Sequence, residues 1–242
     1  MRSYAIGDIH GYLDQLTAAH GLIAADRART GDHEAPVVHI GDLCDRGPDT
    51  RGVIDLLLMG IARGENWIVL KGNHDRMFGC FLETPWRNDP SHDHLFWLDP
   101  PLGGRKTLAS YGVDTDRDRA DIHAEARDKV PPAHLDFVRG NPTSYQRGDC
   151  FFAHAGIRPG IPLDHQTEDD LVWIRDDFLY ATQDHGPLVV HGHTTVDHAT
   201  HYGNRLNIDS GAGYGRPISA VVLEGRDAFL LTEDGRKPLL PR

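Results

Sequence analysis

Residues 36–47 read PVVHIGDLCDRG, an apolar run that ends in glycine and acidic residues. A short run rich in β-branched residues and bounded by turn residues is typical of a buried strand. Similar runs alternate with helical patterns along the first 75 residues: strand-like at 2–8 and 66–70, helical at 12–27 and 50–63. Asp49, directly before the second helical pattern, is a suitable N-cap. The first third is therefore predicted to be β-α-β-α-β, an order that favours a layered α/β core.

The rest of the chain divides into a mixed middle and a strand-rich end. Further strands are expected at 149–153 and 187–190, and strands of a meander at 205–208, 218–223 and 228–232. Short helices are expected at 104–111, 116–129 and 131–139. No repeat or linker divides the sequence. We therefore predict one domain over residues 1–242, with a mostly helical insertion at about 83–141.

Composition narrows the range of partners. The 242 residues carry 36 acidic and 25 basic side chains, a net charge of −11, whereas a duplex nucleic-acid binder needs a basic face. No apolar run approaches the roughly 18 residues of a membrane span, and the N-terminus lacks the apolar stretch of a signal peptide. The three cysteines are scattered and odd in number, which favours a reducing, cytoplasmic setting. We expect neither nucleic acid duplex nor membrane as a partner.

Five short segments share one plan, in which a strand-like run ends in small, acidic, amide or imidazole residues. They are GDIHG at 7–11, GDLCDRG at 41–47, GNHD at 72–75, HAG at 154–156 and GHT at 192–194. Oxygen and nitrogen ligands without thiolate suit Mn²⁺, Fe or Zn²⁺. Together the motifs supply six such ligands, namely two Asp, three His and one Asn. Six are too many for one catalytic ion that keeps an open position. They match two ions that share a carboxylate, an arrangement suited to phosphoryl displacement.

The five motifs, in this order, resemble the signature of the phosphoprotein phosphatase branch of the calcineurin-like metallophosphoesterases: GDxHG, GDxxDRG, GNHE, HAG and GH. Only Asp75 departs from it, where the family commonly has Glu. Because the chain has little beyond the catalytic core, it is most similar to the compact bacterial and phage serine/threonine protein phosphatases. The resemblance implies an αββα sandwich of two mixed β-sheets flanked by helices.

The resemblance also implies metal ligands. Asp8 and His10 would bind the first ion, Asp42 would bridge both, and Asn73, His154 and His193 would complete the second. Two divalent ions per chain are expected, with Mn²⁺ as the first choice and Fe or Zn²⁺ as alternatives. In such enzymes a hydroxide that bridges the ions attacks phosphorus directly, since two cations lower the pKa of water.

Four further residues would serve the phosphate and the leaving group. His74 would protonate the leaving alkoxide, and Asp45 would hold that imidazole in the required tautomer. The planar fork of Arg46 would bind phosphate oxygens. The run LVWIR at 171–175 resembles the family's W-x-R segment, so Arg175 is the expected second arginine, with Arg158 or Arg147 as the replacements to test.

Three functions are consistent with these residues. The leading prediction is hydrolysis of phosphoserine and phosphothreonine in proteins, so that the partner is a phosphoprotein or a phosphorylated small molecule. The alternative is symmetrical hydrolysis of diadenosine tetraphosphate, although that branch typically has Ala where this chain has Asp45. A catalytically silent metal-binding scaffold is the third, but no ligand is missing. The native metal, the physiological substrate and the oligomeric state stay open.

Residues near the motifs are given structural roles. His191 is expected to be a core or supporting histidine, and Asp209 to fix loop hydrogen bonds beside the site. Trp86, Phe96 and Trp97 are expected to pack within the insertion.

Overall fold

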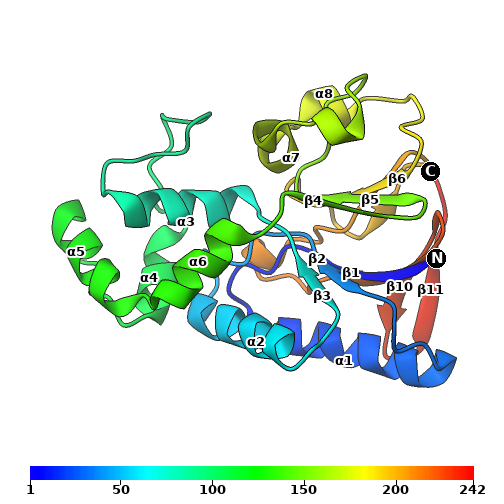
Figure 1. Cartoon of the computed structure of the whole chain (residues 1–242), viewed down its shortest axis with the longest axis horizontal. Coiled ribbons are helices and arrows are strands. Elements are labelled where there is room, and N and C mark those ends of the chain that lie inside the picture. The colour runs from blue at the N-terminus through cyan, green and yellow to red at the C-terminus, as the bar shows by residue number, and fades with distance from the viewer.

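The computed structural model describes all residues, 1–242. Two β-sheets lie face to face, with helices α1 and α2 covering the outer face of one and α7 and α8 lying over the other (Figure 1). The six-stranded sheet has the order β11-β10-β9-β1-β2-β3, and the five-stranded sheet has the order β4-β5-β6-β8-β7. Both sheets mix parallel and antiparallel pairs. The predicted αββα sandwich is confirmed.

Most helices and strands are short. The strands are β1 Arg2–Ile6, β2 Val37–His39, β3 Trp67–Val69, β4 Ser144–Arg147, β5 Cys150–Ala153, β6 Leu188–His191, β7 Thr200–His201, β8 Arg205–Asn207, β9 Ala220–Glu224, β10 Asp227–Thr232 and β11 Gly235–Leu239. The helices are α1 Leu13–Thr30, α2 Thr50–Ala62, α3 Asn73–Glu83, α4 Gly104–Ser110, α5 Arg119–Lys129, α6 Pro132–Gly140, α7 Glu168–Trp173 and α8 Asp176–Leu179. No helix combines the length and apolar character that crossing a membrane requires.

The core follows the alternation of side chains along the strands. In β1, Tyr4 and Ile6 pack with Leu16 of α1 on the helix side of the sheet, whereas Ala5 faces the opposite sheet. Ala5 there joins Val190 of β6 in the layer between the sheets. Successive strand residues point to opposite faces, so both faces of the six-stranded sheet are covered.

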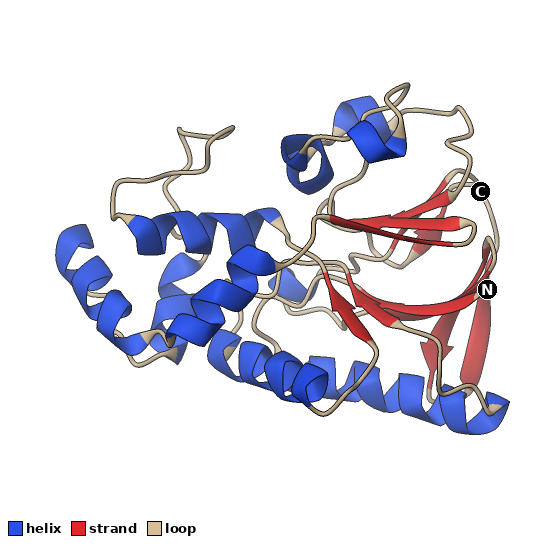
Figure 2. Cartoon of the chain, viewed as in Figure 1, coloured by secondary structure: helices blue, strands red, loops and turns tan.

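Helices α3, α4, α5 and α6 form a separate group at one side of the sandwich (Figure 2). Their shared core contains Phe78 and Phe81 of α3, Leu108 of α4 and Trp97 of the connecting loop. This group contains most of the predicted insertion 83–141, which is helical at its three expected places.

Two expectations about secondary structure were wrong, and Trp86 and Phe96, expected to pack within the insertion, are exposed. Residues 205–208 were expected in the late meander, but β8 pairs in parallel with β6 in the other sheet, and the meander is β9, β10 and β11. Helix α3 was not foreseen, because GNHD was taken as a strand end followed by a loop, whereas the helix begins at Asn73 itself. Asp49 caps α2 as predicted, accepting a hydrogen bond from the N–H of Gly52 at 2.8 Å.

The topology explains why distant motifs meet. Strands β1, β2 and β3 run parallel, as do β5 and β6, so within each sheet their carboxyl ends lie at one edge. Each of these strands is followed within four residues by a predicted metal ligand: Asp8, Asp42, Asn73, His154 and His193. Sites usually form at such loops above a rigid sheet.

Candidate active site

Backbone strain is concentrated in the motifs. Five residues other than glycine have a positive φ, namely His10 (49°), Asp42 (50°), Asp45 (75°), Arg46 (64°) and His193 (64°). This region is costly for residues with a side chain, and such strain is stored mainly at functional sites. All five are among the residues predicted to act in the site.

Two glycines allow carboxylates to lie directly on the backbone. A Cβ at Gly72 would stand 2.2 Å from Oδ1 of Asp42, and one at Gly192 would stand 2.0 Å from Oδ1 of Asp8. Neither position has room for a side chain. The glycines of GNHD and GHT therefore let two motifs pack against the carboxylates of two others.

Asp42 lies at the centre of the cluster. It belongs to both groups of side chains whose ligand atoms lie within 4.8 Å of one another, one with His10 and His74 and one with Asp8 and His154. Its Oδ2 is 3.5 Å from Nε2 of His10, and its Oδ1 is 3.3 Å from Nε2 of His154. The two oxygens thus face different histidines, the arrangement expected of a carboxylate shared by two ions.

The donor atoms around Asn73 fit a cation. Nδ1 of His154 lies 3.0 Å from the carbonyl oxygen of Ile40, which can only accept, so in the neutral ring Nε2 carries a lone pair. That Nε2 lies 2.9 Å from Oδ1 of Asn73, which is also 2.9 Å from Nδ1 of His193. Nε2 of His193 is buried without a hydrogen-bond partner. Facing lone pairs and an unpartnered buried nitrogen are satisfied by metal coordination.

Burial tunes the charge of these ligands. It lowers the pKa of His10 to about 3 and that of His193 well below its usual value, which leaves neutral imidazoles able to bind metal. Burial also raises the pKa of Asp8, with the charges of Asp209 and Asp42 adding to the effect. At Asp42 burial acts in the same sense, but the surrounding histidines outweigh it and lower the pKa.

His74 is held by a network on its Nδ1 side. Its Nδ1 lies 2.6 Å from Oδ2 of Asp45, which also accepts a hydrogen bond from Nε1 of Trp97 at 2.8 Å. Oδ1 of Asp45 accepts from the hydroxyl of Thr107 at 2.7 Å. Burial alone would lower the pKa of His74, but the charges of Asp42 and Asp45 outweigh it and raise the pKa. The imidazole is thus fixed in orientation and biased toward its protonated form.

Arg46 spans the histidines of the cluster. Its two terminal nitrogens lie 3.0 Å from Nε2 of His10 and 3.1 Å from Nε2 of His74. Arg46 lines a cavity of about 450 Å³, and Asp42, Arg175 and Arg216 form other parts of its wall. This volume lies within the range of small-molecule sites, and the arginines suit an anionic ligand.

The structure brings together every residue predicted from the motifs. Arg175 faces the same cavity as Arg46. The replacements considered for it are engaged elsewhere, since Arg158 binds Asp170 and Asp177 and Arg147 donates to the backbone of Arg2.

Two residues that support the site were missed. Trp97, expected only to pack, also donates to Asp45, and Thr107 binds the same carboxylate. The signal for Thr107 was GG at 103–104 followed by TL at 107–108, which resembles a segment of the bacterial members of the family. Nothing in the sequence pointed to the indole of Trp97.

The supporting roles of His191 and Asp209 hold. His191 is buried, and its Nε2 accepts from Arg205 at 3.2 Å. Asp209 accepts from the hydroxyl of Thr195 and from the N–H of Gly211, both at 2.9 Å. Asp209 therefore fixes two loops beside the metal ligands.

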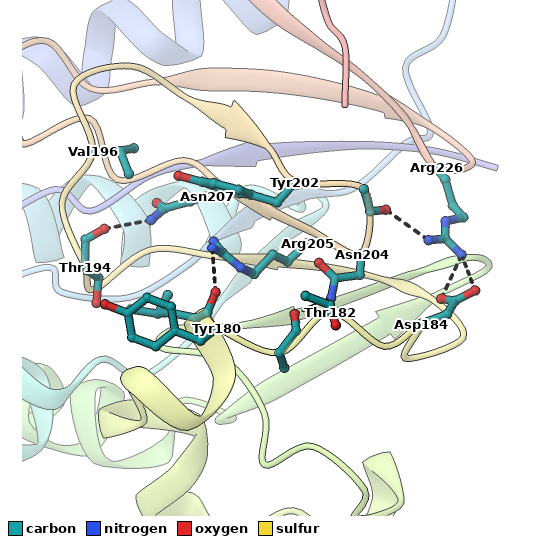
Figure 3. A pocket seen from close by; sticks show the side chains of 13 residues that line it. Tyr180, Thr182, Asp184, Thr194, Val196, Tyr202, Asn204, Arg205, Asn207 and Arg226 are labelled. Carbon is teal, nitrogen blue, oxygen red and sulfur yellow. Dashed lines mark hydrogen bonds and ion pairs between the residues drawn. The ribbon is translucent and has the colours of Figure 1, made fainter. Parts of the chain in front are cut away.

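A larger cavity of about 780 Å³ lies elsewhere, beside β7, β8 and the segment after α8 (Figure 3). Its charged side chains already have partners. Arg226 pairs with Asp184, and Arg205 donates to the carbonyl of Leu179 and stacks 3.7 Å from the ring centroid of Tyr202. This cavity lacks the ligand cluster and is not the catalytic centre.

Comparison with known proteins agrees with this geometry. A family model described as "Calcineurin-like phosphoesterase" matches residues 1–217. A relative from Anoxybacillus flavithermus, "Bis(5'-nucleosyl)-tetraphosphatase PrpE [asymmetrical]", is 25% identical, and the match covers 89% of this chain and 88% of the relative. A second protein of that name, from Geobacillus thermodenitrificans, is also 25% identical over 89% of this chain and 88% of its own.

Solved structures share the fold. A cold-active protein tyrosine phosphatase superposes with a TM-score of 0.65 at 16% identity, covering 99% of this chain and 79% of that one. A structure provisionally described as a diadenosine tetraphosphatase gives a TM-score of 0.61 at 21% identity and covers 99% and 94%.

Proposed function

Because the chain belongs to the calcineurin-like phosphoesterase family and is a metal-dependent phosphoesterase, we propose that it hydrolyses dinucleoside tetraphosphates asymmetrically. The observation that carries the proposal is the catalytic cavity, which at about 450 Å³ is far larger than one phosphoryl group and is lined by several arginines. Relatives that match along most of their length bear that name. The name also indicates an asymmetrical cut, rather than the symmetrical one considered from the sequence alone.

The metal centre is proposed to consist of Asp8, His10, Asp42, Asn73, His154 and His193. Two divalent ions, Mn²⁺ in the first instance, would supply positive charge to the phosphate and lower the pKa of a water enough to provide a nucleophile near neutral pH. Asp42 would be shared by the two ions, since its Oδ2 faces His10 and its Oδ1 faces His154. Asp8 and His10 would complete the first site, and Asn73, His154 and His193 the second.

The chain's own residues then act on the phosphate and the leaving group. Arg46 binds phosphate oxygens with its two terminal nitrogens, and Arg175, which lines the same cavity, provides a second guanidinium for them. His74 donates the proton on Nε2 to the oxygen of the bond that breaks, while Asp45 keeps the other nitrogen protonated. Hydrolysis adds hydroxide to phosphorus and this proton to the leaving group.

One observation favours a second function, hydrolysis of phosphoserine and phosphothreonine. Alkoxides are poor leaving groups and depend on a general acid, and the buried contact of 2.6 Å between Asp45 and His74 is well suited to that task. Phosphoanhydrides have better leaving groups and depend on it less. The phosphomonoesterase predicted from the sequence therefore stays as the competing proposal.

A substrate panel separates the two proposals. We expect kcat/KM for diadenosine tetraphosphate to exceed that for phosphoserine and phosphothreonine peptides by tenfold or more, with AMP and ATP as products. Two molecules of ADP would instead support symmetrical cleavage. A higher kcat/KM for the phosphopeptides would support the protein phosphatase hypothesis and overturn the first proposal.

A further inference from the structure

The loop at 211–216 packs directly on the catalytic centre. A Cβ at Gly213 would stand 2.6 Å from Cδ2 of His10 and 2.8 Å from Nη1 of Arg46, so the backbone touches both side chains. Gly211 and Gly215 have φ of 93° and 80°, which only glycine adopts without strain. The loop is therefore shaped to bring its side chains to the mouth of the cavity.

Two of these side chains, Tyr214 and Arg216, line the cavity and have been given no individual role so far. Tyr214 is 66% exposed, and the guanidinium carbon of Arg46 lies 5.1 Å from its ring centroid. Arg216 has one ionic partner, Asp197, at 2.8 Å. That carboxylate is 92% exposed, and such surface pairs contribute little to stability. Arg216 is therefore free to exchange this partner for a phosphate.

The number of arginines exceeds what one phosphate needs. A phosphoryl group bound by two cations and by Arg46 already has a partner for each oxygen. Arg175 is a second guanidinium for that phosphate, and Arg216 adds a third to the wall of the same cavity. An asymmetrical cut leaves three phosphates on the far side of the broken bond, and these need cationic partners.

We infer that Arg216 determines substrate specificity by binding the phosphates beyond the scissile bond, with the ring of Tyr214 as an adjacent surface on which a purine stacks. This inference rests on the proposed cleavage of polyphosphates. Arg216 then selects among phosphorylated substrates, whereas Arg46 and His74 act on every substrate.

The test compares Arg216→Ala with a matched arginine. Arg226 is equally exposed, at 38% against 37% for Arg216, and it also pairs with one exposed aspartate. Arg216→Ala should lower the ratio of kcat/KM for diadenosine tetraphosphate to that for p-nitrophenyl phosphate by about 10- to 100-fold, the range of one charge-assisted hydrogen bond. The loss should lie mainly in KM. Arg226→Ala should leave the ratio unchanged.

Lysine and binding measurements complete the test. Arg216→Lys should restore the ratio in part, because lysine keeps the charge but not the paired contact. In calorimetry, Arg216→Ala should weaken binding of a methylene-bridged ATP analogue at least tenfold more than binding of orthophosphate.

The outcomes separate this inference from the proposed function. If the parent does not cleave diadenosine tetraphosphate and the variant still loses affinity for the ATP analogue, the substrate proposal fails and the role of Arg216 stands. Equal losses for every substrate and ligand, or no loss, would overturn the inference, because a merely structural residue behaves in that way.

Discussion

Replacing Asp45 with Asn should leave His74 in place while removing the charge that favours its protonated form. The amide oxygen can take the position of Oδ2, where it still accepts from Nδ1 of His74 and from Trp97. The amide group then faces Thr107, whose hydroxyl has a second neighbour in Thr50 at 3.2 Å. The substitution thus changes charge more than shape.

The size of the effect follows from the lost charged hydrogen bond. Such a bond contributes about 1.5–3 kcal/mol, which corresponds to roughly one to two units in the pKa of His74. Because that pKa is raised in the parent, it should fall in the variant. The alkaline limb of kcat against pH should therefore move to lower pH, and kcat for an alkyl phosphate at pH 7–8 should fall by about 10- to 100-fold.

The assay is kcat against pH for an alkyl phosphate and for p-nitrophenyl phosphate, whose leaving group needs less protonation. Asp55→Asn is the control, since Asp55 also pairs with a histidine, His134, at 3.1 Å, away from the cluster. The control should keep the parental profile. An unshifted alkaline limb in Asp45→Asn, or equal losses on the two esters, would refute the role given to the Asp45–His74 pair.

Three further changes test other parts of the structure. His74→Asn should lower kcat by about 10²–10⁴-fold for alkyl phosphates and less for p-nitrophenyl phosphate, and elemental analysis should find the metal content retained; an equal loss on both esters would point to phosphate positioning instead. Arg175→Ala should raise KM and weaken inhibition by orthophosphate. Arg158→Ala, which removes a surface ion pair, should leave both KM and this inhibition unchanged. An unchanged KM and inhibition in Arg175→Ala would exclude Arg175 as a phosphate ligand. Asp26→Ala should lower the free energy of unfolding by about 3–5 kcal/mol in urea, because buried Asp26 pairs with Arg236 and accepts from Tyr4. Since the pKa of Asp26 is lowered in the folded state, this contribution is present above the unfolded pKa and is lost as the pH falls through the folded pKa. A difference between parent and variant that did not narrow as the pH was lowered would contradict it.

The motif residues could be placed from sequence because strand ends and glycines constrain them locally. Asp8 follows a short buried strand, and Gly72 leaves space that only a glycine can leave beside Asp42. Once parallel pairing is assumed, the convergence of such residues at the sheet edges follows from topology. The ligands were therefore predictable as a set.

The residues that were missed depend on how the insertion and the late loops fold back. Trp97 reaches Asp45 across 52 positions of chain, and Arg216 reaches the cavity through a loop whose path is set by left-handed glycines. Helix α3 was missed for a different reason. Its apolar residues Met77, Phe78 and Phe81 have helical spacing, but the motif at its start was taken for a loop.

Metal stoichiometry tests the central claim most directly, namely that five dispersed motifs assemble one site for two ions. Elemental analysis of the parent after equilibration with Mn²⁺ should give about two ions per chain, and Asp42→Asn should retain fewer and lose activity, because the shared carboxylate belongs to both halves of the cluster. The control Asp164→Asn, which changes an exposed carboxylate, should keep the metal content and activity of the parent. A parent that binds no ion, or an Asp42→Asn variant that keeps two ions and full activity, would contradict the account.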